Sequence, residues 1–348
     1  MKRFLTVLAL LASSILLFST GAEAGQEQFI EVLPAITSES SAPNRIWAGA
    51  FQLVWNELVD EILKKPVKFA GCNSEAAKAL NRKTFKKSDV SDSSYYIKSG
   101  IVSLDLKTEI ETALKEKFNE TSDILDSFDW SENPENIFIY AMLKKDFKYI
   151  IPFDKLPSGS FGNNYTDIEY FGIDENSSRN LRKNVSIMFY NADNDFAVKL
   201  YTKSKDIILL YRTDDDKTFD KYYEDIDEKS LTYYGSRNFT KDDKLRIPDL
   251  NLYLETNFPE LEGRRIKGTN YFIGKTAETV KFKMDNEGVK LKNEAALMIM
   301  KTMHIAAGRN FNFCDKYILF LIEKGKQTPY YAMRVNDAEI FNKTWKKE

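Results

Sequence analysis

The chain is poor in the residues that build most enzyme active sites. Its 348 residues include one histidine, His304, and two cysteines, Cys72 and Cys314. A Ser-His-Asp or Cys-His arrangement would have to use His304, and zinc sites built from several His or clustered Cys ligands are excluded. The sequence also lacks a glycine-rich phosphate loop of either common pattern. We therefore predict a non-enzyme without a cofactor or metal, with only a glycosidase-like carboxylate pair left open.

The cysteine count leaves two alternatives. If the chain is exported, a disulfide between Cys72 and Cys314 is permitted. The two residues lie far apart in the sequence, so geometry alone decides whether they pair. Two separate buried thiols are the other possibility.

The chain also lacks an excess of charge of either sign. Lys and Arg together number 50 and Asp and Glu 52, which gives a formal net charge of −2. A balanced surface offers no electrostatic case for nucleic acid or for an anionic membrane. The basic pairs Arg264-Arg265 and Lys346-Lys347 stand alone in the sequence, as solvated pairs usually do. We expect a monomer with no nucleic-acid or membrane partner.

Long apolar runs are absent except at the beginning. Lys2-Arg3, the apolar run from Phe4 to Phe18 and Ala22-Glu23-Ala24 have the order of a secretory signal, which predicts cleavage after Ala24 and secretion to the extracellular space or periplasm. No later segment approaches the ~20 apolar residues of a membrane-spanning helix. Residues 25–43 are polar and weakly patterned, which predicts an extended or mobile lead-in. Residues 44–348 contain no internal repeat and are predicted to form a single domain.

Two periodicities divide this domain into helices and strands. Apolar residues at helical spacing from Phe51 to Leu63 predict an amphipathic helix, and Leu106 to Phe118 reads as another. The acidic run Thr213-Asp214-Asp215-Asp216-Lys217 favours a helix N-terminus, where carboxylates suit the dipole; a calcium loop is the alternative. Strands are predicted over residues 137–142, 196–201, 207–211, 245–250, 280–284, 317–322 and 330–335.

The last quarter of the chain contains an unusual interval. The strand 280–284 and the turn Asp285-Asn286-Glu287-Gly288 are followed by about two dozen residues before the next apolar strand, and loops of that length are usually functional or disordered. The interval contains Glu294-Ala295-Ala296 and the apolar run Leu297 to Met300. That run could instead be a permanent core strand.

This order of pieces resembles the C-terminal part of serpins, in which an acidic-acidic-x-Gly turn leads into an Ala-rich hinge and an exposed reactive loop. Phe313-Cys314-Asp315-Lys316-Tyr317 takes the place of the Phe-x-x-Pro-Phe motif, and Ala332-Met333-Arg334-Val335 that of Phe-x-Gly-Arg-Val. The Pro and the Gly of those motifs are missing here. Further similarities occur upstream in the same order, at residues 44–49, 137–154, 196–211 and 245–250.

The resemblance implies an α+β serpin-like fold, in which helices surround large mixed or antiparallel sheets and a reactive loop over residues 289–312 is exposed. In that family a serine or cysteine protease cleaves the loop, and the hinge side then inserts into the main sheet as a new strand. The hinge residues would be Glu287, Gly288, Val289, Leu291, Asn293, Glu294, Ala295 and Ala296. The candidates for the scissile bond are Lys301, Thr302, Met303, Ala306 and Ala307.

The hinge sequence leaves two functions open. Alternate residues after Gly288 fit a half-buried strand, which favours a suicide-substrate inhibitor. However, bulky residues from Val289 to Lys292 stand where inhibitory serpins carry small ones, and they would slow insertion. The alternative is a non-inhibitory binding or structural protein that keeps the fold without rapid insertion.

Overall fold

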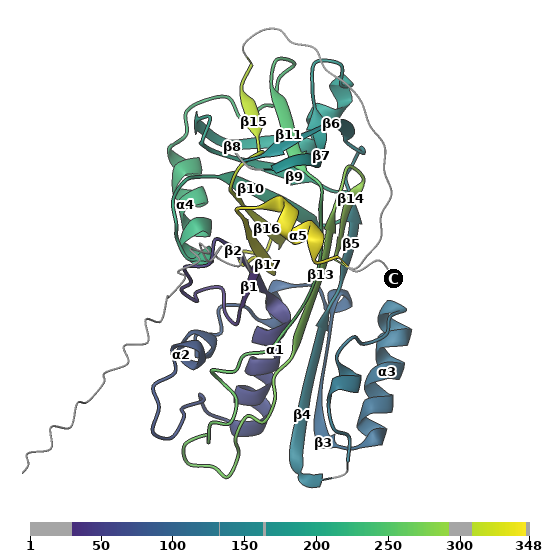
Figure 1. Ribbon diagram of the computed structural model, residues 1–348, viewed down its shortest axis with the longest axis vertical. Coiled ribbons are helices and arrows are strands. Elements are labelled where there is room, and N and C mark those ends of the chain that lie inside the picture. The colour runs from purple at the N-terminus through teal and green to yellow at the C-terminus, as the bar shows by residue number, and fades with distance from the viewer. Residues whose placement is uncertain (1–29, 132, 163–164, 292–307, 346–348) are drawn as a thin grey trace, which may run out of the picture.

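The computed structural model describes residues 30–131, 133–162, 165–291 and 308–345. A seven-stranded sheet in the order β1-β2-β17-β16-β10-β9-β8 forms its centre (Figure 1). These strands are β1 (Ile30–Leu33), β2 (Asn44–Ala48), β8 (Val185–Ala192), β9 (Asp195–Tyr201), β10 (Asp206–Arg212), β16 (Tyr317–Glu323) and β17 (Tyr331–Val335). Every residue of β16 and β17 is buried, and most of their side chains are large and apolar.

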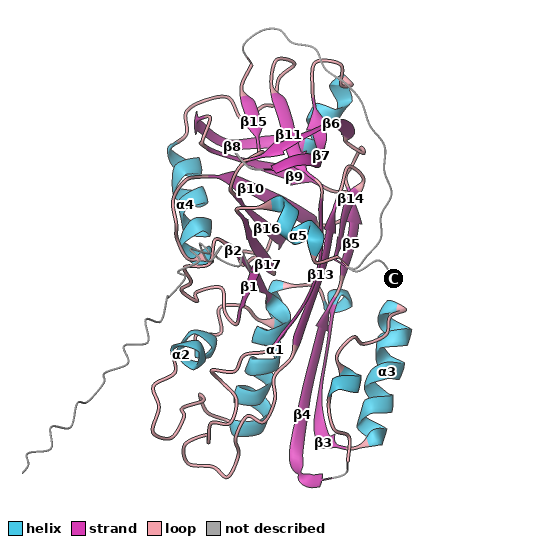
Figure 2. Ribbon diagram, viewed as in Figure 1, coloured by secondary structure: helices cyan, strands magenta, loops and turns pink. Residues whose placement is uncertain are grey.

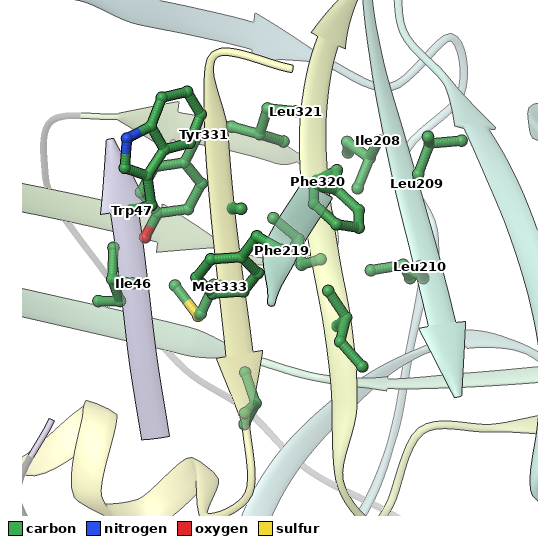
Figure 3. Packing of buried hydrophobic residues seen from close by; sticks show 14 of the residues in the cluster. Ile46, Trp47, Ile208, Leu209, Leu210, Phe219, Phe320, Leu321, Tyr331 and Met333 are labelled. Atoms are coloured by element: carbon green, nitrogen blue, oxygen red, sulfur yellow. The ribbon is translucent and has the colours of Figure 1, made fainter. Parts of the chain in front are cut away.

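Side chains from both faces of this central sheet build the main hydrophobic core. Phe320 of β16 meets Phe219 and Tyr223 of helix α4 (Phe219–Thr232) at ring distances of 6.2 and 5.5 Å. Figure 3 shows Trp47, Tyr331 and the neighbouring strand residues in this packing. Neighbouring antiparallel strands place these side chains in cross-strand pairs, which fixes their register.

A second sheet is antiparallel and has the order β12-β13-β14-β5. Its strands are β12 (Leu250–Thr256), β13 (Glu278–Met284), β14 (Gly288–Leu291) and β5 (Lys145–Lys148). We call it the hinge sheet because β14 contains the predicted hinge. The long strand β4 (Asn133–Leu143) precedes β5 in the chain, with one residue between them. Among the described strands, β4 pairs only with β3 (Tyr95–Val102). In Figure 1, β13 and β4 both extend towards the lower end of the molecule.

A third sheet, β15-β11-β7-β6, lies at the upper end in Figure 1. It consists of β6 (Asp154–Phe161), β7 (Tyr165–Ile173), β11 (Lys244–Pro248) and β15 (Asn310–Asn312). Strand β15 pairs in parallel with β11, so the last residues of the predicted reactive loop belong to this sheet.

The remaining helices are coloured in Figure 2. They are α1 (Gly49–Glu57), α2 (Glu75–Asn81), α3 (Leu104–Phe118) and α5 (Ala338–Lys343), with short helical turns at 58–63, 87–89, 92–94, 125–127 and 179–184. Helix α3 begins where the Ser103 hydroxyl accepts the Leu106 N–H at 3.1 Å and ends at Asn119 in the left-handed conformation. It covers a separate small core beneath β3 and β4, formed by Leu106, Ile110, Leu114, Leu125, Trp130, Phe138 and Tyr140.

The strands expected from alternation are all present, and both predicted helices form. The first of them turns π-helical at Leu58–Leu63 and stops at Lys64, whose φ is 53°. Within the predicted lead-in, Ile30–Leu33 forms β1 and pairs with β2. Both ends of the predicted reactive loop differ from an exposed loop, because Gly288–Leu291 and Asn310–Asn312 are paired strands. Within the described residues, no helix is long and apolar enough to cross a membrane.

Candidate functional site

The turn between β13 and β14 is closed by the side chain of Asp285. One of its carboxyl oxygens accepts the backbone N–H groups of Glu287 at 2.9 Å and Gly288 at 3.3 Å. The other lies 2.9 Å from the Lys283 ammonium group. An Asp that bonds its own backbone two residues ahead favours a turn, so this local chemistry reverses the chain after Met284.

Gly288 allows β14 to approach β5 more closely than any other residue could. A Cβ atom at this position would stand 2.3 Å from the Phe147 carbonyl oxygen and 2.7 Å from the Lys148 Cα. Both are backbone atoms, which cannot move aside as the end of a side chain can. The glycine of the predicted hinge therefore has a steric reason here, which is the close approach of two backbones.

Strand β14 inserts between β13 and β5. Val289 lies opposite Met284 on β13 and opposite Phe147 on β5, and Lys290 lies opposite Lys283 and Asp146. Val289 is fully buried, as the predicted alternation requires, while Lys290 is half-buried. The first residues after the turn are thus already a central strand of the hinge sheet.

Below β14 a cavity of about 1020 Å³ separates β13 from β4. We call it the β4–β13 cavity. Helix α1 and the segment before β13 contribute to its walls, which are about as apolar as they are polar. Its lining includes Val54, Trp55, Leu58, Ile137, Ile139, Ala141, Tyr271, Phe272, Glu278 and Val280. Strand β13 and β4, the strand that precedes β5 in the chain, are therefore apart where β14 would continue downwards.

On both strands that border this cavity, β13 and β4, one face is directed towards the main core. On β13, Glu278, Val280 and Phe282 face the main core, because they alternate with the half-buried Thr279 and Lys281. On β4, Ala141 and Leu143 pack against the main core, whereas Phe138 and Tyr140 belong to the small core under α3. A strand placed between β13 and β4 would consequently have one face on the main core.

Glu278 is the most unusual polar group of this site. Glu278 is 5% exposed, and neither carboxyl oxygen makes a hydrogen bond of normal geometry within the described residues, although the Phe51 backbone N–H lies near enough to lower the pKa of the carboxyl slightly. Burial raises the pKa of the Glu278 carboxyl to about 8, because the charged form is not solvated. The sequence analysis did not identify this residue, although extending the alternation of β13 by two positions before Val280 would have put it on the buried face.

A second carboxyl with a raised pKa lies near the turn. Burial raises the pKa of Asp249 to about 7, and the neighbouring carboxylates of Asp285 and Glu169 add to the effect. Asp249 separates β11 from β12, so this group joins the upper sheet to the hinge sheet. Two titratable groups near neutral pH therefore lie along the hinge sheet, one near each end.

Strand β5 is fixed to the central sheet by a buried ionic cluster. The Lys145 ammonium group, 7% exposed, contacts Glu323 of β16 and lies 2.9 Å from Asp206 of β10. The Tyr330 hydroxyl donates to Asp206 at 3.0 Å, and Ser91 donates its hydroxyl to Glu323 at 2.7 Å. Although burial alone would raise it, the pKa of Glu323 is lowered by the hydrogen bonds from Lys145 and Ser91. This cluster holds β5, which flanks β14, against the central sheet.

The predicted site residues divide into two groups. Glu287, Gly288, Val289 and Leu291 lie at the turn and on β14, where Glu287 is exposed and 3.5 Å from the Lys148 ammonium group. The other predicted hinge residues, Asn293, Glu294, Ala295 and Ala296, lie outside the described residues. His304 and all five candidates for the scissile bond, Lys301, Thr302, Met303, Ala306 and Ala307, also lie outside them.

The two cysteines do not form the disulfide that export would permit. Both are half-buried free thiols. Cys72 lies beside Arg264, whose guanidinium is 3.0 Å from its sulfur, whereas Cys314 follows β15 at the upper sheet. The alternative of two separate thiols is the one observed.

Carboxylates of the acidic run before α4 form ion pairs with basic side chains. Asp216 contacts the buried guanidinium of Arg45, and Asp215 lies 2.9 Å from Lys217. Within the described part of the chain, no group of three or more His, Cys, Asp or Glu side chains is arranged to hold a metal ion. These carboxylates precede Phe219, where α4 begins, as the helix-start interpretation predicts.

Comparison with known proteins gave matches by structure alone. No protein-family model matches the sequence, and no curated protein matches it. A thyroxine-binding globulin complex with thyroxine is 10% identical with a TM-score of 0.43, over 68% of this chain and 65% of that chain. Serpin48 of the insect Tenebrio molitor, a highly specific serpin, is 13% identical with a TM-score of 0.42, over 82% and 95%. Human glycosylated kallistatin is 10% identical with a TM-score of 0.44, over 84% and 96%.

The elements follow one another in the order that the sequence resemblance implied, from β2 and α1 through β4, β9 and β10 to β13, the Gly288 turn, β16 and β17. The segment after the Gly288 turn differs from an open reactive loop at its beginning, since Val289 and Lys290 pair with both β13 and β5, and Leu291 pairs with β5.

Proposed function

We propose that the chain is a secreted protease inhibitor that acts as a suicide substrate, by cleavage of the segment after Leu291 and insertion of its hinge side into the hinge sheet. The observation that supports this most strongly is the β4–β13 cavity directly below β14. Strands β13 and β4 are separated below β14, so a longer β14 would find unpaired backbone on both sides. Formation of those backbone pairs would release free energy.

The register of β14 specifies how such an insertion would proceed. Gly288–Leu291 pairs with β5, and Val289 and Lys290 also pair with β13, both in antiparallel register. Continued downwards, it would place Asn293 between Val280 and Leu143. Ala295 would follow between Glu278 and Ala141. These flanking residues all lie on the main-core side of their strands. In this register the predicted inward residues after Gly288 would therefore face the main core.

The partner that fits this mechanism is a serine or cysteine protease, because both classes form an acyl-enzyme with the cleaved chain. Insertion must be faster than hydrolysis of that acyl-enzyme for the protease to be retained. The candidates for the scissile bond remain Lys301, Thr302, Met303, Ala306 and Ala307. A protease that prefers Lys or Met before the cut bond would fit them.

The second candidate function is a non-inhibitory binding protein with the same fold. Glu278 favours it, because a buried carboxyl that makes no hydrogen bond of normal geometry lies where Ala295 would have to pack. Insertion would replace the cavity beside that already buried group by a methyl side chain that offers no hydrogen bond, and it would exclude any water that solvates the carboxyl there, which costs free energy. Insertion would then be slow enough for a protease to complete hydrolysis and leave.

One experiment separates the two functions without knowledge of the target. The mature chain is cut once within residues 292–307 by a protease of broad specificity, and the thermal unfolding of intact and cut protein is compared. An inhibitor should show a large rise in melting temperature after the cut, because the strand inserts. An unchanged or lower melting temperature would exclude insertion and leave the binding protein.

A further inference from the structure

The lower end of the molecule gathers basic side chains from two distant parts of the sequence. We call residues 64–70 and 260–275 together the lower tip. In Figure 1 the second of these segments is the green loop between β12 and β13, at the opposite end from β15. Its basic residues are Lys64, Lys65, Lys68, Arg264, Arg265, Lys267 and Lys275, against two acidic ones, Glu260 and Glu262. The tip is therefore strongly positive, although the whole chain has a formal charge of −2.

Backbone pairing brings these residues onto one face. Phe69 and Ile266 form an antiparallel bridge, supported by hydrogen bonds from Lys267 N–H to the Lys68 carbonyl at 2.7 Å and from Ala70 N–H to the Arg265 carbonyl at 2.9 Å. Phe69 and Ile266 are both buried. Since side chains alternate along extended chain, their neighbours Lys68, Arg265 and Lys267 point outwards, and all three are exposed.

An aromatic side chain shares this outward face. Phe272 pairs with Arg265 in a second antiparallel bridge, so the two side chains lie on the same side. Phe272 is 63% exposed and the adjacent Tyr271 is 43% exposed. An exposed aromatic pair among unpaired cations is unusual for a surface that contacts only water.

These cations are available for a partner. Among the described residues, Lys65, Lys68, Arg265 and Lys267 have no carboxylate partner. Lys65 donates instead to the carbonyl of Gly268 at 3.2 Å, and Arg265 donates to the carbonyl of Thr269 at 3.2 Å. In contrast, Lys64 pairs with Glu61 at 2.9 Å.

More apolar surface lies at the same end. Of the seven exposed large hydrophobic residues among those described, four are Ile101, Leu104, Tyr271 and Phe272. Val102, at the end of β3, lines the β4–β13 cavity together with Tyr271 and Phe272, so the end of β3 and the lower tip border the same cavity.

We propose that the lower tip docks on an anionic lipid surface, with Lys68, Arg265 and Lys267 at the phosphate headgroups and Phe272 inserted at the headgroup level. The cations alone would suit any polyanion, but the exposed aromatic pair beside them favours a surface with an apolar interior. Docking by this end would leave the Gly288 turn, at the other end of the hinge sheet, facing the solution. This inference is independent of the proposed inhibition.

The test uses the chain from Gly25 onwards, so that the apolar run before it is absent, and vesicles of phosphatidylcholine with or without one third phosphatidylserine. The wild type should cosediment with the anionic vesicles and much less with neutral ones, and the binding should weaken as salt is raised. The triple variant Lys68→Gln, Arg265→Gln, Lys267→Gln should bind on the order of 100-fold more weakly, since each cation contributes about fivefold. Phe272→Ser should bind about tenfold more weakly.

A matched control removes the same charge from the opposite end. The triple variant Arg179→Gln, Lys183→Gln, Lys241→Gln neutralises three exposed cations near β11 and should bind as the wild type does. Melting curves of all variants show whether the fold is kept, and the single variant Lys68→Gln replaces the triple if it is not.

Three results would overturn the proposal. They are no binding of the wild type to anionic vesicles, equal loss in the two triple variants, and binding to soluble heparin without binding to vesicles.

Discussion

The carbonyl oxygen of Phe147 lies 2.3 Å from the place where a Cβ atom on Gly288 would stand. Because the obstacle is backbone on β5, a side chain at position 288 would have to push β14 away from its partner strand. The close packing of β14 against β5 thus requires a residue without a Cβ atom at position 288.

Gly288→Ala should therefore destabilise the protein by about 1–3 kcal/mol, the usual cost of forcing an extra methyl group into a packed site. The measurement is the urea midpoint of unfolding. Gly274→Ala is the control, because a Cβ atom there would be 3.8 Å from its nearest neighbour, the ring of Phe272, and stability should change by less than about 1 kcal/mol. Equal stability of both variants would contradict the close approach of β14 and β5.

Stability should fall as the pH rises through the range in which Glu278 ionises. The folded-state pKa of about 8 exceeds the ordinary value of about 4.3, so the folded protein binds the extra proton. The stabilisation is complete below the ordinary pKa and is lost as the pH rises towards 8. It amounts to at most about 5 kcal/mol, at about 1.4 kcal/mol per pKa unit.

Melting temperatures measured between pH 5 and pH 8 check this dependence. Glu278→Gln should flatten it and raise the melting temperature at pH 8. The slope that remains should belong to Asp249, whose pKa is about 7, and should disappear when Asp249→Asn is added. Exposed Glu116 on α3 provides the control Glu116→Gln, which should leave the profile unchanged. A wild-type profile without a fall between pH 5 and 8 would refute the unpartnered burial of Glu278.

Lys145→Ala should cost about 3–5 kcal/mol of unfolding free energy, because it would leave Asp206 and Glu323 buried without their cation. Lys148→Ala is the matched control on the same strand. Lys148 and Glu287 are both more than half exposed and 3.5 Å apart, so its loss should cost no more than about 1 kcal/mol. Denaturant unfolding of both variants gives the comparison, and similar costs would mean that the Lys145 cluster does not anchor β5.

The register of β14 predicts opposite effects for two adjacent alanines in the proposed inhibitor. Ala295→Arg would place a charge on the buried face beside Glu278 and Ala141, and should abolish the rise in melting temperature after cleavage within residues 292–307. Ala296→Arg would point to the other face and should leave that rise nearly unchanged. If both variants behave alike, the chain does not insert in the register of Gly288–Leu291.

Many strands of the fold could be predicted from short stretches of sequence. Alternation and apolar runs predicted β4, β9, β10, β13, β16 and β17, because each strand's side-chain pattern depends only on which of its own faces are buried. The turn at Asp285 and Gly288 was equally visible, since an Asp side chain that bonds the next residues acts within a few positions. The order of these pieces was enough to indicate a serpin-like fold.

The candidate site was only partly visible. The sequence indicated Gly288 and the inward position of Val289, but it gave no reason to expect that this strand would already be paired with β5, more than 130 residues earlier. Glu278 was missed because the predicted strand began at Val280, two residues too late. The Lys145 cluster was missed because its three charged members come from three separate strands.

Tertiary structure decided everything that depends on long-range proximity. It left Cys72 and Cys314 as free thiols in two separate loops, and it brought Lys68 to Arg265 and Lys267 although about 200 residues separate them in the chain. In the sequence, Arg264-Arg265 appears as an isolated basic pair, and the charge of the whole chain is balanced. Secondary structure follows from the periodicity of neighbouring side chains. Cavities, buried charges and charged surfaces depend instead on which strands pair, and a local sequence pattern does not determine that pairing.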